Sequence, residues 1–130
     1  MQGGYVLAFD FGLRHIGISV GQFVTRTASP LTTLQANGGR PNWAEITDLV
    51  TQWRPTTLIV GLPINMDDSE SEMSLQARAF GTALANRFEI PVEMVDERLS
   101  TRAAQEIDPS RSHEVAAVLI AETWLGQSQD

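Results

Sequence analysis

The stretch from Val6 to Gly21, VLAFDFGLRHIGISVG, decides the fold. Two apolar runs flank a turn that contains glycine, and each run has the length and composition of a buried β-strand. Asp10 stands at the carboxyl end of the first run, where its neighbours are apolar. An acid needs a reason to be there, because burying an unpaired charge is costly. Asp10 is therefore either a turn aspartate that holds the backbone at Gly12 or one wall of a functional site.

The rest of the chain continues this pattern outward from the two strands. A third strand is predicted at 25–34, which gives an antiparallel meander. Further elements are predicted, in chain order, as a helix at 43–53, a strand at 57–63, a helix at 73–88, a strand at 90–98, a short helix at 100–108 and a last helix at 113–124. Later strands that alternate with helices favour parallel pairing. The sequence thus predicts one α/β domain over residues 1–130, with a central mixed five-stranded sheet, three strands antiparallel and then two parallel, and helices on both faces.

Composition and charge exclude several classes of protein. The chain has no cysteine, so disulfides and thiolate metal sites are excluded. No apolar run approaches the roughly 18 residues of a membrane span and no export signal is evident, so we expect a cytoplasmic protein without a membrane partner. The net charge is −7, and all nine basic residues are arginine. This balance argues against a nonspecific polyanion binder, so any nucleic acid must be held by a local arginine patch.

Two acids from distant parts of the sequence are expected to meet. Asp10 and Glu97 each lie at or near the carboxyl end of a predicted strand, and parallel strands bring those ends to one edge of the sheet. Like charges in contact need a proton or a cation, and a hard divalent ion such as Mg²⁺ or Mn²⁺ is the simplest partner. Asp96 should point to the opposite face of the sheet. The simpler interpretation of Asp96 and Glu97 is a solvated strand end.

Four segments carry a resemblance to a known family. They are LAFDFGLRHIGISVGQ at 7–22, LIVGLPINMD at 58–67, VDERLST at 95–101 and AAVLIAETWL at 116–125. In this order, and over nearly the whole chain, they resemble the YqgF family, described as Holliday junction resolvases and pre-16S rRNA nucleases. The resemblance implies a ribonuclease H-like fold and metal-dependent hydrolysis of phosphodiester bonds, in maturation of the 5′ end of pre-16S rRNA.

The resemblance also implies a catalytic and metal-binding set. Asp10 and Glu97 match the family's first two acids, which would bind two Mg²⁺ or Mn²⁺ ions about 4 Å apart. His113 takes the position at which the family has a third acid. Imidazole suits Mn²⁺ or a transition ion better than Mg²⁺, which prefers oxygen ligands. His113 could instead act as a general acid, orient a water molecule, or simply pack against the fold.

Five further residues are implied to bind the substrate. Arg14 sits where the family usually has a basic residue, and Asn65 lies on a loop expected at the same edge of the sheet. Arg98 and Thr101 belong to the VDERLST segment, and Arg111 takes the place of a family lysine. Thr101 could equally be a helix cap.

Three functions remain open at this level. The first is a nuclease that acts on an RNA precursor or branched DNA. The second is a non-catalytic protein that binds nucleic acid, ribosome-assembly proteins or transcription proteins, with His113 marking lost chemistry. The third and most remote is a fragment of an actin-like or Hsp70-like ATPase, because DFGLRHIGISVG also resembles their phosphate-binding hairpin. Those ATPases enclose nucleotide between two such domains, and one is expected here.

Overall fold

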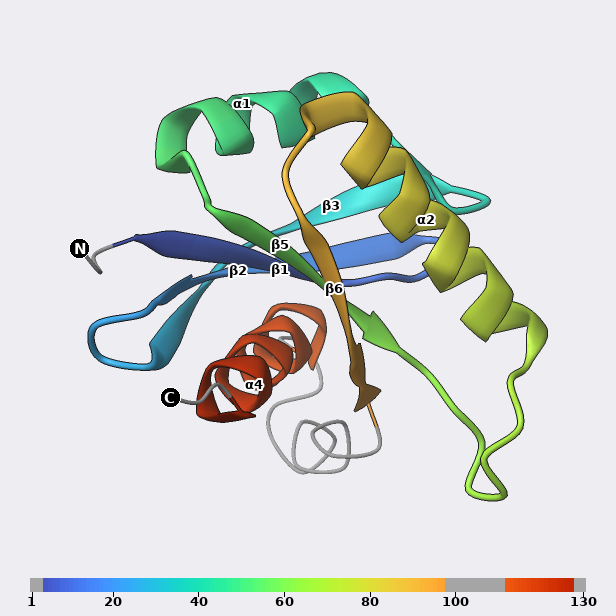
Figure 1. The fold of residues 1–130 in the computed structure, drawn as a ribbon. Helices are drawn as coiled ribbons and strands as arrows, with labels where there is room; N and C mark the ends of the chain where they lie inside the picture. The colour runs from blue at the N-terminus through green and yellow to red at the C-terminus, as the bar shows by residue number, and fades with distance from the viewer. Residues whose placement is uncertain (1–3, 98–111, 128–130) are drawn as a thin grey trace.

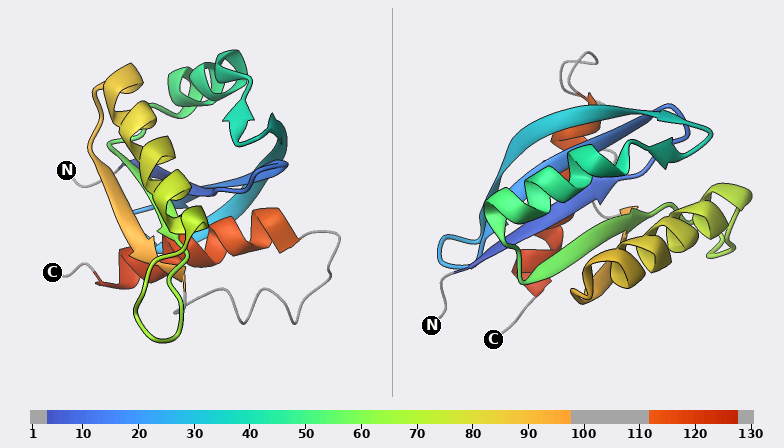
Figure 2. Two further views of the ribbon diagram at one scale, coloured as in Figure 1. Left: turned by 90° about the vertical axis from the view of Figure 1, so that its right-hand side faces the viewer. Right: turned by 90° about the horizontal axis from the view of Figure 1, so that it is seen from above.

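The fold is a single mixed sheet covered by helices on both faces (Figure 1), seen in a computed structural model that describes residues 4–97 and 112–127. The strands are β1 (Tyr5–Asp10), β2 (His15–Gln22), β3 (Thr27–Asn37), β4 (Arg40–Pro41), β5 (Thr57–Leu62) and β6 (Val92–Asp96). The helices are α1 (Trp43–Trp53), α2 (Glu72–Phe88) and α4 (Ser112–Gln127). Helices α1 and α2 lie on one face of the sheet and α4 lies on the other (Figure 2). The predicted short helix at 100–108 lies outside the described residues.

The sheet places β1 at its centre. The strand order is β4-β3-β2-β1-β5-β6. Strand β1 pairs antiparallel with β2 and parallel with β5, and β5 pairs parallel with β6. The predicted arrangement of three antiparallel and two parallel strands is confirmed. The predicted number of strands is one too low, because Gly38 and Gly39 adopt positive φ angles and turn the chain back so that the two-residue β4 pairs with β3.

Strand β3 is longer than its apolar pattern predicts. It continues to Asn37 because its pairing with β2 runs on to His15 opposite Gln35, and β4 pairs with its last residues. Its proline, Pro30, lies where the register between β2 and β3 shifts. A bulge accommodates proline, which cannot donate to a regular ladder. A proline-containing segment can therefore form part of this long strand.

Strand β1 contributes to a core on each face of the sheet because its side chains alternate. Leu7 and Phe9 are fully buried in the core under α1 and α2, and Val6 and Ala8 are fully buried in the core under α4. A strand that is buried on both faces reads as a continuous apolar run, as this one does. By the same alternation Asp10 belongs to the α4 side.

Helix α4 packs closely on β2 because the residues of β2 that face it are small. Gly17, Ser19 and Gly21 alternate with large apolar residues, and a Cβ at Gly17 would collide with the backbone carbonyl of His113. The buried Ser19 hydroxyl donates a 2.8 Å hydrogen bond to the carbonyl of Ala117, so it is not left unsatisfied. Among the described residues, no helix is long and apolar enough to span a membrane. The close contact between Gly17 and His113 fixes the first turn of α4 at the end of the sheet where Asp10 lies.

Candidate active site

Asp10 lies at the end of the central strand, on the face covered by α4. Its partner in the β1–β2 ladder is Gly17, the residue on which the first turn of α4 rests. The chain then turns through Phe11–Arg14 into β2. Asp10 is partly buried, whereas the four residues before it are fully buried. The carboxyl group therefore lies at the carboxyl end of the central strand, just before the turn into β2.

Glu97 directly follows β6 and reaches the same face. Val95 is buried in the core under α4, and Glu97, two residues later, has the same orientation. Its side chain passes over Gly61 of β5, where an added Cβ would lie 2.6 Å from Glu97 Oε2. Gly61 provides the space that the Glu97 side chain needs. Asp96 ends β6 opposite Leu62 of β5, and the orientation of its side chain toward the other face stays a prediction from strand alternation.

The two carboxyl groups form one electrostatic unit. Burial, then the negative charge of Glu97, and then a hydrogen bond between the two side chains raise the pKa of Asp10 to about 8. Two carboxylates cannot both stay ionised in contact at low cost, so they share a proton or bind a cation. Without a cation, Asp10 holds a proton near neutral pH.

The chemistry of the two groups fits a hard cation. Both offer carboxylate oxygens, which are the ligands that Mg²⁺ and Mn²⁺ take from proteins. Residues 4–97 and 112–127 contain no group of three or more His, Asp or Glu side chains placed to hold a metal ion. Asp10 and Glu97 thus place two oxygen-bearing side chains together, and their binding of a metal ion, with or without a third protein ligand, stays a prediction.

His113 lies in the first turn of α4 and contacts another histidine. Its ring stacks on His15, the first residue of β2, with ring centroids 4.8 Å apart and planes inclined by 26°. Burial and the charge of His15 lower the pKa of His113, while Glu114 acts in the opposite direction. His113 therefore favours the neutral form, which is the form that can ligate a metal.

Arg14 and Asn65 occupy two different loops. Arg14 is exposed in the turn between β1 and β2, and its carbonyl accepts a hydrogen bond from the Ala36 amide. Asn65 follows β5 and donates a 3.0 Å side-chain hydrogen bond to Ser69 Oγ within its own loop. Figure 1 shows this loop projecting away from the sheet. Arg98, Thr101 and Arg111 lie outside the described residues.

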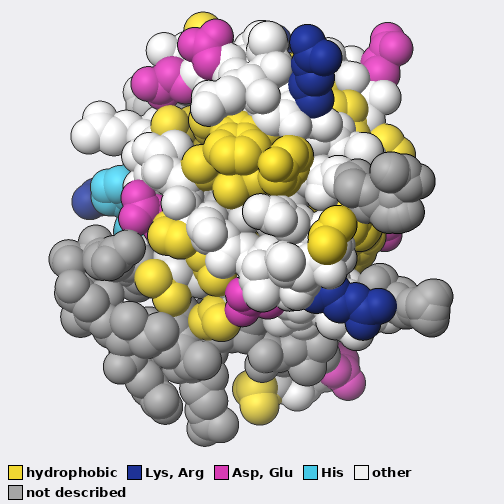
Figure 3. Space-filling view, turned by 90° about the vertical axis from the view of Figure 1, so that its left-hand side faces the viewer, with side chains coloured by type: hydrophobic (Ala, Val, Ile, Leu, Met, Phe, Trp, Pro, Cys, Tyr) yellow, Lys and Arg dark blue, Asp and Glu magenta, His cyan; other side chains and the backbone are white. Residues whose placement is uncertain are grey.

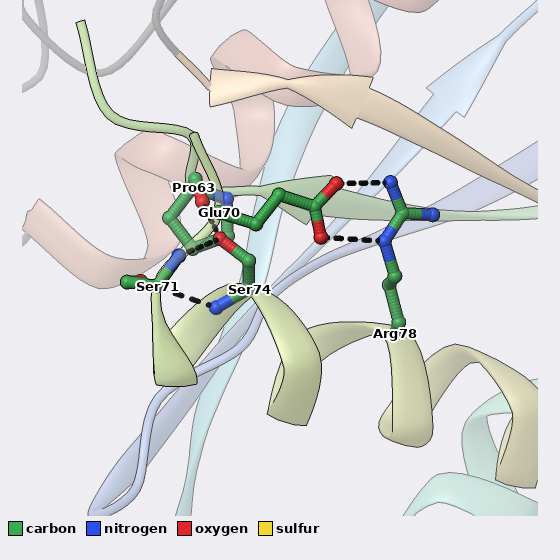
Figure 4. Close-up of polar contacts among 5 residues, drawn as sticks. All are labelled: Pro63, Glu70, Ser71, Ser74 and Arg78. Atoms are coloured by element: carbon green, nitrogen blue, oxygen red, sulfur yellow. Dashed lines mark hydrogen bonds and ion pairs between the residues drawn. The ribbon is translucent and has the colours of Figure 1, made fainter. Parts of the chain in front are cut away.

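The loop that carries Asn65 is fastened to the start of α2 (Figure 4). Ser71 and Ser74 form a reciprocal capping box, and the Ser74 hydroxyl also donates to the carbonyl of Pro63. Glu70 and Arg78 form a bidentate ion pair, in which Arg78 Nε lies 2.9 Å from Glu70 Oε1 and Arg78 Nη2 lies 2.6 Å from Glu70 Oε2. Hydrogen bonding to Arg78 lowers the pKa of Glu70. The loop is thus closed at its base by contacts to α2.

Two residues of the site are not indicated by the sequence analysis. His15 lies beside the predicted turn, and a single histidine there does not reveal which ring it meets. Gly61 stands inside the LIVGLPINMD segment, where glycine within a buried strand often marks the close approach of another group. That signal could have identified Gly61 as the residue that makes room for Glu97.

Comparison with known proteins places the chain in a family. The family model RuvX, Holliday junction resolvase, matches residues 4–127. The chain belongs to the RuvX family. RuvX and YqgF are two names of one family, so the predicted family is confirmed.

Curated relatives of this RuvX-family chain carry one name. A protein of Nitrosococcus oceani is 52% identical over 95% of this chain and 88% of its own length. A protein of Saccharophagus degradans is 46% identical over 94% of this chain and 93% of its own length. Both are named "Putative pre-16S rRNA nuclease". The similarity therefore extends over nearly the whole of each protein.

Solved structures show the same fold at low sequence identity. T. thermophilus RuvC in complex with a Holliday junction substrate has a TM-score of 0.61 at 15% identity, covering 97% of this chain and 98% of that chain. The fowlpox virus resolvase bound to Holliday junction DNA has a TM-score of 0.59 at 8% identity, covering 94% and 97%. These likenesses concern the architecture alone, which is the predicted ribonuclease H-like fold.

Proposed function

We propose that this RuvX-family protein is a nuclease that hydrolyses phosphodiester bonds with a divalent metal ion, in maturation of the 5′ end of pre-16S rRNA. The observation that carries the proposal is the contact between Asp10 and Glu97 on one face of the sheet. Two carboxyl groups held together by parallel strands are costly without a cation. The names of the curated relatives support the reaction and the substrate.

Asp10 and Glu97 would hold the metal ion. A bound Mg²⁺ or Mn²⁺ supplies positive charge that offsets the two carboxylates and stabilises negative charge developing on the phosphate. The protein holds the two acids in place: β1 fixes Asp10, and the contact with Gly61 fixes the path of the Glu97 side chain. Two ions rather than one would need further ligands, for which His113 is the proposed protein donor.

The substrate would approach the edge of the sheet that carries the acids. Arg14 is exposed in the adjoining turn and is proposed to contact phosphate. Asn65 is proposed to contact the substrate from the loop after β5, and Arg98, Thr101 and Arg111 are proposed from their sequence positions. An RNA precursor is the proposed partner and branched DNA the alternative substrate. The proposed location is the cytoplasm.

A cleavage assay tests the proposal. Purified protein is incubated with a 5′-extended 16S rRNA precursor and, separately, with a four-way DNA junction, in Mg²⁺ and in Mn²⁺. We expect metal-dependent cleavage of the RNA by the wild type and none by Asp10→Asn with an unchanged circular dichroism spectrum. His113→Asp restores an oxygen donor and should raise the activity in Mg²⁺ relative to Mn²⁺. Cleavage that persists in EDTA would contradict the proposal.

One observation favours a second candidate, a nucleic-acid-binding protein without catalysis. His113 takes the position at which the family resemblance implies a third acid, and its ring stacks on His15. RNA binding that survives Asp10→Asn, without cleavage in either metal, would support this candidate. The same assay therefore separates the two functions.

A further inference from the structure

Two histidine rings form a small aromatic surface beside the acid pair. They are the only histidines of the chain, they come from β2 and α4, and they stack with centroids 4.8 Å apart. His15 is exposed, whereas His113 is partly buried. Since one face of the His15 ring lies on His113, the exposed area belongs to its other face and its edges. Histidine side chains are visible at the left-hand edge of Figure 3, beside a basic and an acidic side chain.

The fold fixes this surface next to Asp10. His15 begins the strand whose residue Gly17 pairs with Asp10, so His15 stands at the same end of the sheet. The backbone of His113 rests on Gly17, so helix α4 delivers the second ring to the same place. The backbone positions from which both rings project are thus set by β2 and α4. The surface is therefore built into the sheet and the helix.

The neighbouring residues suit a nucleic-acid strand. Arg14 precedes His15 and is exposed in the turn. An exposed ring beside an exposed cation is an arrangement with which proteins bind single-stranded nucleic acid, because the ring stacks on a base while the cation contacts the backbone. Stacking accepts any base, since every base has a π-face.

We propose that the outer face of His15 stacks on a nucleobase of the substrate strand, next to the phosphate that is to be cleaved, with His113 supporting the ring from behind. This rests on the proposed nuclease function, which supplies the strand. His15 thereby becomes a substrate-binding residue, and His113 acquires a supporting role besides its proposed catalytic one. Arg14 would hold the backbone of the same nucleotide.

Binding measurements test this role separately from cleavage. Single-stranded RNA oligonucleotides carrying 2-aminopurine at successive positions are titrated, without divalent metal, into Asp10→Asn protein with and without a change at His15. We expect quenching of 2-aminopurine at one position, and an affinity about five- to tenfold lower with His15→Ala. His15→Phe keeps a ring and should restore affinity and quenching. Gln22→Ala, an exposed change at the other end of β2, is the matched control.

A charged variant separates stacking from electrostatic attraction. His15→Lys adds a cation without a ring and should bind like His15→Ala at moderate salt. If His15→Lys binds as tightly as the parent while His15→Phe does not, or if no position is quenched, the stacking role is wrong. If the wild type cleaves RNA and His15→Ala has the same KM, the stacking role is wrong and the nuclease function stands. If the protein does not cleave RNA but still quenches 2-aminopurine at one position, the stacking role stands and the nuclease function is wrong.

Discussion

The side chain of Glu97 lies directly over Gly61, with Oε2 only 2.6 Å from the position that a Cβ on Gly61 would occupy. The same Cβ would also lie 2.5 Å from Ile120 Cδ1 of α4. The gap left by the missing side chain at Gly61 therefore gives Glu97, which follows β6, the space to lie on the face that carries Asp10. The site depends on the absence of a side chain as much as on the two acids.

Replacing this glycine should impair activity more than stability. Gly61→Ala forces the flexible ends of Glu97 and Ile120 aside, which should cost about 1–3 kcal/mol in the free energy of unfolding. A displacement of about 1 Å at a catalytic group can lower the rate about 100-fold. Urea unfolding and single-turnover cleavage measure the two effects. Gly126→Ala is the control, since a Cβ there meets nothing within 4 Å, and a Gly61→Ala enzyme with full activity would refute the role of the gap.

The raised pKa of Asp10 predicts how stability depends on pH in metal-free protein. The pKa is about 8 in the folded state against 3.8 for the free group. Between these values the folded protein keeps a proton that the unfolded chain releases, so the free energy of unfolding falls as pH rises from about 4 to about 8. Above pH 8 no further loss arises from this group. The total should be on the order of a few kcal/mol.

Asp10→Asn isolates this contribution because an amide does not ionise. Urea unfolding in EDTA at pH 5.5 and pH 8.5 should show a larger loss of stability for the wild type than for Asp10→Asn. Titrating groups remote from the site act in both proteins and cancel in the difference, whereas Glu97 is coupled to Asp10 and its change belongs to the effect that is measured. Equal losses in the two proteins would show that Asp10 is not held in its protonated form.

The close contact of α4 with β2 predicts a strong effect at Gly17. Gly17→Ala places a Cβ against the backbone carbonyl of His113, and backbone moves less readily than the end of a side chain. We expect a loss of about 1–3 kcal/mol in the free energy of unfolding, measured by urea denaturation. The displaced first turn should also weaken the stacking of His113 on His15, visible as altered histidine ring resonances in NMR spectra. Gly126→Ala, again the control, should leave the ring resonances unchanged and should not lower the free energy of unfolding, because alanine favours the helix more than glycine does.

The arrangement of the sheet and the meeting of the two acids could be predicted from the sequence. Alternating strands and helices indicate parallel pairing, and parallel pairing brings Asp10 and Glu97 to one edge. The contact of His15 with His113 could not be predicted, because it depends on how α4 sits on Gly17, which periodicity does not specify. Strand β4 could not be predicted, because two residues are too few to show an alternating pattern. Arg98, Thr101 and Arg111 stay predictions from sequence alone.

The central claim is that Asp10 and Glu97 act as one metal-dependent catalytic unit, and a double-mutant cycle of cleavage tests it most directly. Single-turnover rates on the 5′-extended 16S rRNA precursor are measured in Mg²⁺ and Mn²⁺ for wild type, Asp10→Asn, Glu97→Gln and the double variant. Residues that act together give non-additive losses. We predict that each single change lowers the rate by about 1000-fold or more and that the double variant is little worse than either. Near-wild-type cleavage by either single variant, with the fold intact, would contradict the account.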